Sequence, residues 1–209
     1  MFQEAVDARI LLLIDKISHV PELYNNFYLA GGTALTLQLG HRKSFDIDLF
    51  SKKDFNVEKY SQVILSLDGK ILREEKGTID AVIDDVKLSL LFYPYKLLEK
   101  YHMIGHIRVA DIKDIACMKV VAISQRADKK DFYDIYEVLK NMSPSELKEL
   151  FLKKYGEKKI NCYHILKSFF YFEDAEDSPD PISLNQTKWD EVKEYFISNE
   201  KIFTESLLS

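Results

Sequence analysis

The spacing of apolar residues along the chain alternates between two periods. Apolar residues three and four apart predict helices, whereas strict alternation, or a short apolar run between turn residues, predicts strands. In the first 70 residues these patterns predict a helix over residues 4–18, a strand over 27–30, a helix from Thr33 to Leu39, a strand over 45–50 and a helix over 56–67. Thr33 is a residue type that caps helices, and Gly40 is typical of a helix end.

The rest of the chain shows more strands and then only helices. Strands are expected over residues 71–75, 78–83 and 86–93, with a tight turn at Asp84-Asp85, followed by a short extended piece at 107–109 and helices over 112–125 and 130–139. Beyond Asn141 the pattern is helical, with one loop at 173–185. We therefore expect an α+β fold, with a mixed sheet flanked by helices, a core over residues 1–140 and a helical C-terminal extension over 141–209.

The strand over 45–50 carries the clearest chemistry. Asp46 and Asp48 project to one face, whereas Phe45, Ile47 and Leu49 project to the other. Two carboxylates so placed lie about 6–7 Å apart at Cα. Hard divalent cations prefer such oxygen ligands and often bridge them to substrate phosphates. An ordinary exposed strand face is the alternative interpretation of this pair.

A double glycine precedes the carboxylates. Gly31-Gly32 joins a predicted strand to a predicted helix, which lets a phosphate approach the backbone closely and directs helix N–H groups at it. Alone it is usually just a turn. Joined in order with the acidic strand, it indicates metal-assisted phosphoryl or nucleotidyl transfer.

Composition excludes several other classes of protein. The 209 residues are 46% hydrophobic and 30% charged, which is typical of a soluble globular protein. The longest uncharged apolar run, Leu88 to Tyr95, is far short of the roughly 20 residues that a membrane span needs, and no secretory signal opens the chain. Cys117 and Cys162 are too few for a disulfide framework, so we expect a cytoplasmic protein that does not enter the membrane.

The net charge of −5 by itself argues against a nucleic-acid partner, but the charges are unevenly distributed along the chain. Residues 1–140 hold 20 basic and 21 acidic groups, whereas residues 141–209 hold 9 and 13. Most of the acidic excess therefore lies outside the expected core. The total charge does not decide the partner.

Two blocks of sequence carry a family resemblance. The first is Gly31-Gly32-Thr33-Ala34-Leu35 with the run from His41 to Phe50, which contains Arg42, Ser44, Asp46 and Asp48. The second comprises residues 111–116, Lys119, Arg126 and residues 129–134, which include Lys130, Asp131 and Asp134. Together they resemble the AbiEii/MenT-type nucleotidyltransferase toxins of the polymerase-beta-like superfamily, over roughly residues 25–140.

The resemblance implies roles for the first block. Asp46 and Asp48 would bind Mg²⁺ or Mn²⁺, and Gly31, Gly32 and Thr33 would face the triphosphate of an NTP. Arg42 and Ser44 occupy positions where the family carries a basic and a hydroxyl residue. A guanidinium group suits phosphate through its bidentate fork. A surface salt bridge is the alternative for Arg42.

The second block adds cations and acids on helices. Lys119 and Arg126 are seven residues apart, so a continuous helix would place both on one face, where they could bind phosphates. The alternative is a lysine whose amine reaches solvent. By the resemblance Lys130 would also contact the nucleotide. Asp131 would orient Lys119 or accept the acceptor's proton, with Asp134 supporting it.

One position departs from the wider superfamily. Many members carry a third metal-binding acid on a later strand, and Ser89 occupies the matching position here. Asp80 is close in sequence but belongs to the preceding strand. Ser89 therefore makes a catalytically impaired nucleotide-binding module, acting through a protein partner, one alternative to an active enzyme.

The leading hypothesis is a Mg²⁺-dependent nucleotidyltransferase that moves an NMP from an NTP to an acceptor and releases pyrophosphate. The resemblance implies a toxin of a toxin–antitoxin or phage-defence (abortive infection) system, with a tRNA 3′ end as acceptor and a winged-helix antitoxin as partner. A transferase that modifies an antibiotic is a further alternative, favoured by the acidic C-terminal part. Binding to RNA predicts instead a basic face built from Lys52, Lys53, Lys129 and Lys130.

Overall fold

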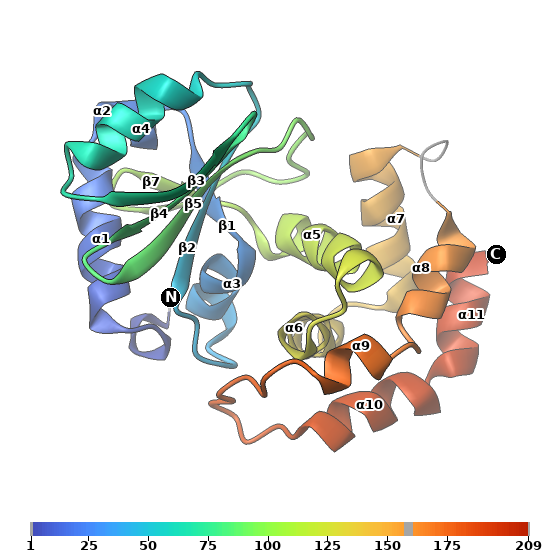
Figure 1. The fold of residues 1–209 in the computed structure, drawn as a ribbon. Coiled ribbons are helices and arrows are strands. Elements are labelled where there is room, and N and C mark those ends of the chain that lie inside the picture. The colour runs from blue at the N-terminus through green and yellow to red at the C-terminus, as the bar shows by residue number, and fades with distance from the viewer. Residues whose placement is uncertain (1, 157–160, 209) are drawn as a thin grey trace. The chain divides into compact units, whose positions relative to one another are not determined.

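The computed structural model describes residues 2–156 and 161–208, which form two compact units, Met1–Asp111 and Ile112–Ser209 (Figure 1). The first unit contains η1 (Gln3–Ala5), α1 (Ala8–Ser18), α2 (Pro21–Tyr24), β1 (Tyr28–Ala30), α3 (Gly31–Leu39), β2 (Asp46–Ser51), α4 (Val57–Leu65), β3 (Lys70–Glu75), β4 (Thr78–Ile83), β5 (Val86–Phe92), β6 (His102–Ile104) and β7 (Ile107–Val109). Its seven strands form one mixed sheet in the order β3-β4-β5-β2-β1-β7-β6.

The central strand β2 pairs antiparallel with β1 and parallel with β5. On one face of the sheet, Ile47 and Leu49 of β2 are buried with Leu88 and Leu90 of β5. Helices α1 and α4 lie against that face, because their amphipathic sequences bury residues such as Ile14 and Ile64 (Figure 1). The opposite face carries the polar positions of the same strands, so the apolar pattern determines which side the carboxylates occupy.

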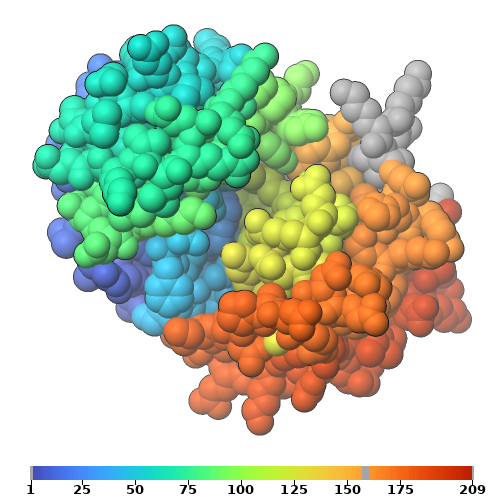
Figure 2. All heavy atoms as spheres, in the orientation of Figure 1, coloured from blue at the N-terminus to red at the C-terminus, as the bar shows by residue number. Residues whose placement is uncertain are grey.

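The second unit is helical. It contains α5 (Ile112–Gln125), α6 (Lys129–Leu139), α7 (Pro144–Tyr155), α8 (Cys162–Ser168), α9 (Glu173–Glu176), α10 (Trp189–Ser198) and α11 (Glu200–Leu208). An aromatic cluster holds it together: Phe196 contacts the rings of Phe132, Phe169, Phe172 and Phe203. In Figure 2 the orange and red atoms of α9 and α10 form one continuous surface within this unit.

The α+β fold class is confirmed, as are most of the predicted elements. The turn at Asp84-Asp85 has two left-handed residues, with φ of 51° and 62°, which a two-residue hairpin requires. The strand β6 was not predicted, and the expected loop at 173–185 begins with the short helix α9. Among the described residues, no helix has the length and apolar character that a membrane crossing requires.

Two expectations differ from the structure. The helix expected to begin after a Thr33 cap begins instead at Gly31, and the Thr33 hydroxyl is used elsewhere. The compact units divide after Asp111 rather than after residue 140, because α5 and α6 pack with the C-terminal helices. Which residues form the catalytic core is a separate matter, and the extent 1–140 stays a prediction.

Candidate active site

The predicted carboxylates lie on the polar face of the sheet, on its central strand. Asp48 is opposite Ala30 of β1 on one side and Ser89 of β5 on the other, and Asp46 is opposite Lys87. The Asp46 side chain is exposed and Asp48 is half-buried. Both carboxylates therefore project from the central strand on the face opposite the buried Ile47 and Leu49.

The double glycine lies directly beside these carboxylates. Gly31 has φ of +71°, and a Cβ atom there would come within 2.5 Å of Asp48 Oδ2. A Cβ atom on Gly32 would come within 2.6 Å of an Arg42 guanidinium nitrogen and 3.3 Å of Ser44 Oγ. Only glycine leaves room for this approach of backbone to side chains. Helix α3 begins here after Ala30, which provides no capping side chain for the first N–H groups of the helix.

Three further predicted residues join this group through hydrogen bonds. The buried Thr33 hydroxyl bonds to Ser44 Oγ at 2.9 Å and donates to the Asp46 carbonyl oxygen. Arg42 is only 4% exposed and donates to the Lys43 carbonyl oxygen at 2.9 Å. A buried cation beside a helix N-terminus is electrostatically unfavourable unless negative charge compensates it. The seven predicted residues of the first unit therefore form one charged group around the start of α3.

Asp80 is a residue whose position the sequence did not reveal. It stands opposite Ser89 in the β4–β5 pair, so Asp80, Ser89 and Asp48 form one row across three adjacent strands. Side chains in such a row share a face of the sheet. Ser89 Oγ donates to Asp80 Oδ1 at 2.7 Å, so the hydroxyl that replaces the expected acid is held by a carboxylate one strand away.

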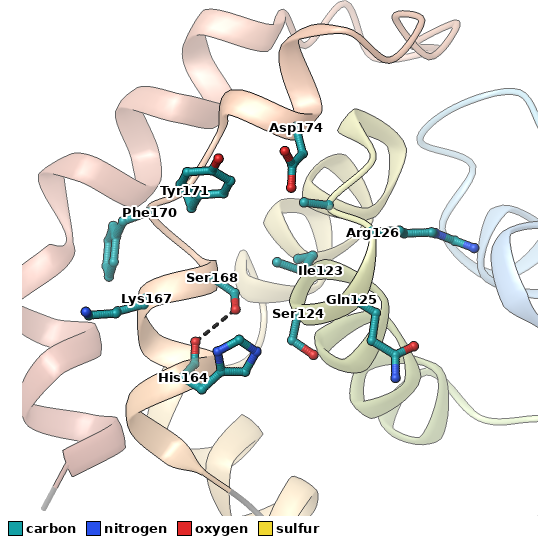
Figure 3. A pocket seen from close by; sticks show the side chains of 11 residues that line it. Ile123, Ser124, Gln125, Arg126, His164, Lys167, Ser168, Phe170, Tyr171 and Asp174 are labelled. Atoms are coloured by element: carbon teal, nitrogen blue, oxygen red, sulfur yellow. Dashed lines mark hydrogen bonds between the residues drawn. The ribbon is translucent and has the colours of Figure 1, made fainter.

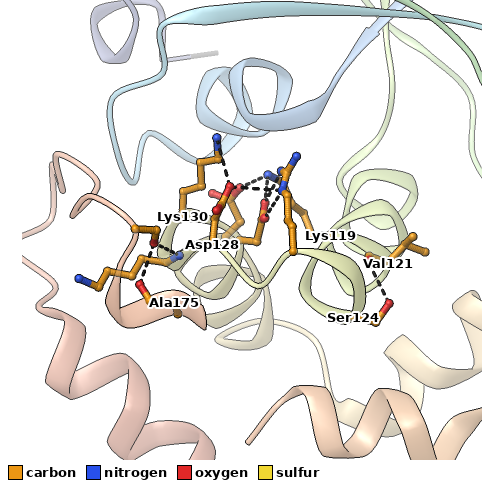
Figure 4. Close-up of polar contacts among 11 residues, drawn as sticks. Lys119, Val121, Ser124, Asp128, Lys130 and Ala175 are labelled. Atoms are coloured by element: carbon orange, nitrogen blue, oxygen red, sulfur yellow. Dashed lines mark hydrogen bonds and ion pairs between the residues drawn. The ribbon is translucent and has the colours of Figure 1, made fainter. Parts of the chain in front are cut away.

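The predicted residues of the second unit form a separate group within α5, α6 and the turn between them. Lys119 Nζ lies 2.7 Å from Asp131 Oδ1 and 2.6 Å from Asp134 Oδ2, and both carboxylates are completely buried (Figure 4). Arg126 Nε and Nη2 donate to Asp131 at 2.8 and 3.1 Å. The charges of Lys119 and Arg126 offset those of Asp131 and Asp134, which makes the burial of Lys119 and the two carboxylates tolerable.

This arrangement bears on the two roles left open for Asp131. Burial raises the pKa of its carboxyl, but the charge of Lys119 and the hydrogen bond from Arg126 outweigh burial, and the pKa lies below its ordinary value. A carboxylate stabilised as the anion is a weak proton acceptor. The short contacts of Asp131 with Lys119 and Arg126 also suit the orienting role, and both roles stay predictions.

Exposure separates the cations of this unit. The Arg126 and Lys130 side chains are 53% and 45% exposed, whereas Lys119 is 6% exposed. Lys130 lies 3.6 Å from Asp128, and Lys129, expected on a basic face, is instead nearly buried and pairs with Asp180 at 3.0 Å. Of these four cations, Arg126 and Lys130 are therefore the ones that a large anionic ligand can contact.

A pocket of about 520 Å³ adjoins Arg126, between the end of α5 and the residues of α8 and the following turn (Figure 3). His164, Ser168 and Tyr171 line it, and the Arg126 side chain extends away from them. Of the two cysteines, Cys117 is buried, and burial raises the pKa of its thiol to about 12. Cys117 therefore cannot act as a nucleophile near neutral pH.

The family described as "Nucleotidyl transferase AbiEii toxin, Type IV TA system" matches residues 16–101 and 96–204. The chain belongs to the AbiEii nucleotidyltransferase family. It is also 41% identical over 191 residues to the uncharacterized protein aq_aa25 of Aquifex aeolicus (strain VF5), a match that covers 87% of this chain and 90% of that protein. The predicted resemblance is confirmed, and the chain is a nucleotidyltransferase.

Solved structures share the AbiEii fold at low identity. JHP933 from Helicobacter pylori aligns with a TM-score of 0.55 at 17% identity, covering 97% of this chain and 95% of that chain. A putative nucleotidyltransferase from H. pylori gives 0.53 at 16%, covering 100% and 98%. ANT(2")-Ia in complex with adenylyl-2"-tobramycin gives 0.52 at 19%, covering 70% and 97%. These similarities confirm the fold.

The contact between Gly31 and Asp48 can be tested by adding one methyl group. We expect Gly31→Ala to displace the Asp48 carboxylate and to reduce transfer activity at least ~10-fold, because its Cβ has no space. Gly156→Ala is the matched control, since Gly156 has φ of +84° but nothing within 4 Å of its Cβ position. Both variants should lose about 1–2 kcal/mol of stability. Equal activity of the two would show that the contact is unimportant.

The ion group of the second unit should make the free energy of unfolding depend on pH in the acidic range. Because the pKa of Asp131 is lowered in the folded state, its contribution is present above the unfolded value, about 3.9, and is lost as pH falls through the folded value. We expect Asp131→Asn to cost about 3 kcal/mol at pH 7 and to flatten the loss of stability below pH 4. Urea unfolding between pH 2.5 and 7 measures both effects, with Asp128→Asn as a control expected to cost under about 1 kcal/mol.

Proposed function

We propose that this protein is a divalent-metal-dependent nucleotidyltransferase that transfers an NMP from an NTP to an acceptor hydroxyl and releases pyrophosphate. The single observation that carries the proposal is the contact between the start of α3 and Asp48, where Gly31 leaves only enough space for a hydrogen atom beside the carboxylate. A helix N-terminus and two strand carboxylates at one point suit a phosphate together with the cation that accompanies it.

The residues of the first unit fit a bound Mg²⁺ or Mn²⁺. Asp46 and Asp48 supply hard oxygen ligands on one face of a strand. Among the described residues there is no group of three or more His, Cys, Asp or Glu side chains that could hold a metal ion. Oxygens of the triphosphate would therefore complete the coordination. When bound, the cation would neutralise charge that develops on the transferred phosphoryl group.

The protein's own groups bind and orient the nucleotide. N–H groups at the start of α3 donate to phosphate oxygens, and Gly31 and Gly32 keep that approach free of side chains. The Arg42 guanidinium, which lies beside Gly32, adds positive charge for the triphosphate. Thr33 connects this region to β2 through the Asp46 carbonyl oxygen, so the phosphate-binding and carboxylate segments keep a fixed spacing.

We assign the ion group of the second unit to charge stabilisation in the same reaction. Arg126 and Lys130 contribute exposed positive charge for phosphates. Asp131 and Asp134 hold Lys119 and orient Arg126, and neither is assigned the acceptor's proton. The proposal for this group is supported by its charges and burial within its own unit.

The proposed acceptor is the 3′ end of a tRNA, and the proposed biological role is that of a toxin controlled by an antitoxin. The family described as a type IV toxin supports this role, and the expected compartment is the cytoplasm. Ser89 favours the second candidate, a module that binds nucleotide without transferring it, because it reduces the carboxylates on this face of β2 and β5 to two.

Loss of a metal ligand tests the proposed reaction. With each labelled NTP, Mg²⁺ and total tRNA, the protein should label tRNA, and Asp48→Ala should reduce labelling roughly 100- to 1,000-fold or more. Asp15→Asn, an exposed carboxylate of α1, is the control expected to retain activity. Labelling that survives Asp48→Ala would exclude this assignment. Nucleotide binding without transfer by the unmodified protein would favour the module instead.

The row of Asp80, Ser89 and Asp48 allows a second test, on metal binding rather than activity. If Asp80 orients the Ser89 hydroxyl toward the cation, Asp80→Asn and Ser89→Ala should each weaken Mn²⁺ binding about 10-fold, measured by Mn²⁺ electron paramagnetic resonance. Ser89→Asp should strengthen it in the Asp80→Asn background. Unchanged Mn²⁺ affinity in all three variants would limit Asp80 to a structural role.

A further inference from the structure

A second hollow lies in the first unit, beyond the ends of β2 and β5. Its volume is about 590 Å³, and it is formed by Lys52, which follows β2, and by the irregular segment 94–101 between β5 and β6. Three lysines line it, Lys52, Lys96 and Lys100, together with one acid, Glu99. The lining therefore carries a net positive charge in a chain whose net charge is −5.

Aromatic rings stand among these cations. Tyr95 and Tyr101 line the same hollow. Lys52 Nζ lies 5.9 Å from the centroid of the Tyr101 ring, and the Arg108 guanidinium carbon lies 5.2 Å from that centroid. Lysines that can bind phosphates, interleaved with rings on which bases can stack, are the combination by which proteins hold single-stranded nucleic acid.

The hollow lies beyond the end of β2, the strand that carries the two carboxylates. Asp46, Asp48 and Phe50 alternate to one side of β2, and Lys52 follows two residues later, about 13 Å along the chain from Asp48. Ring contacts connect the segment to β1 and β2 at both of its ends: Tyr101 contacts Tyr28, Tyr28 contacts Phe50, Phe50 contacts Tyr93 and Tyr93 contacts Tyr95. Tyr28 and Phe50 are buried, so these contacts anchor the segment 94–101 on the strand that carries the carboxylates and on its neighbour β1.

We propose that this hollow binds the phosphates and bases of a single-stranded nucleic acid whose end is the acceptor in the transfer reaction. The inference rests on the proposed function and assigns the acceptor's binding surface within the first unit. It keeps Lys52 of the expected basic face but not Lys129, which is nearly buried and paired with Asp180. Three lysines also disfavour a cationic acceptor such as an aminoglycoside.

Fluorescence anisotropy with a labelled ten-nucleotide RNA strand tests the charges, using the full chain without NTP. We expect Lys96→Glu/Lys100→Glu to weaken binding at least ~10-fold and to lower the slope of log K against log salt by about 1.4, because two phosphate contacts are lost. The matched control is Lys70→Glu/Lys76→Glu, which changes the net charge equally at exposed positions outside the hollow. An equal loss of RNA affinity in the two double variants would mean that the RNA is attracted only by net charge, and it would overturn the proposal.

Tyr95 tests the stacking separately. Tyr95→Leu should weaken binding of the RNA roughly 5- to 150-fold. Tyr95→Phe, which keeps the ring, should bind the RNA nearly as tightly as the unmodified protein does. Thermal unfolding of every variant shows that the fold is retained. Equal binding by Tyr95→Leu and Tyr95→Phe would show that no base stacks there.

A third measurement separates this inference from the proposed function. The affinity for a fluorescent ATP analogue should be unchanged in Lys96→Glu/Lys100→Glu, and a loss there would make the hollow a nucleotide site and refute the proposal. If RNA binding is unchanged in Lys96→Glu/Lys100→Glu while Asp48→Ala still abolishes transfer, the inference is wrong and the transferase assignment stands. If transfer survives Asp48→Ala, the assignment fails whatever the strand-binding result.

Discussion

The alternation of residues along β2 is the constraint on which the first unit depends. Ile47 and Leu49 must enter the core beneath α1 and α4, and the two-residue period then forces Asp46 and Asp48 to the opposite face. Because β2 pairs with β1 on one side and β5 on the other, the same register brings Ala30 and Ser89 beside Asp48. Burial of apolar surface therefore positions the site, and no separate device is needed to orient the carboxylates.

The second unit solves a different problem, that of keeping charges in a low-polarity interior. Lys119, Asp131 and Asp134 are nearly or fully buried, and a similar buried pair joins Lys154 of α7 to Asp114 of α5 at 2.5 Å. Removing one partner from such a group leaves an uncompensated charge, which is why these residues depend on one another. Within this ion group the more exposed charge belongs to Arg126, whose side chain is 53% exposed, and Lys130 close by is 45% exposed.

Local pattern was sufficient to predict the main helices and strands, the pair Asp46 and Asp48, and the turn at Asp84-Asp85. Features that depend on strand pairing could not be predicted from the sequence. The hydrogen bond between Ser89 and Asp80 follows from the β4–β5 register, and the spacing of residues within one strand does not determine that register. Thr33 is a cap by propensity, but tertiary contact with Ser44 and β2 overrides that preference. The division after Asp111 follows from the way the helices pack, which composition does not determine.

The irregular segment 94–101 has a consequence for how such enzymes diversify. A shift of one residue in the pairing register of β2 would turn both carboxylates into the core. Mutations that cause such a shift would therefore damage both folding and the site. Loop residues such as Lys96 and Lys100 carry no such double constraint. With the acceptor bound as proposed, substitutions in this loop would change the preferred acceptor, while the register of the central strand would keep the carboxylates in place.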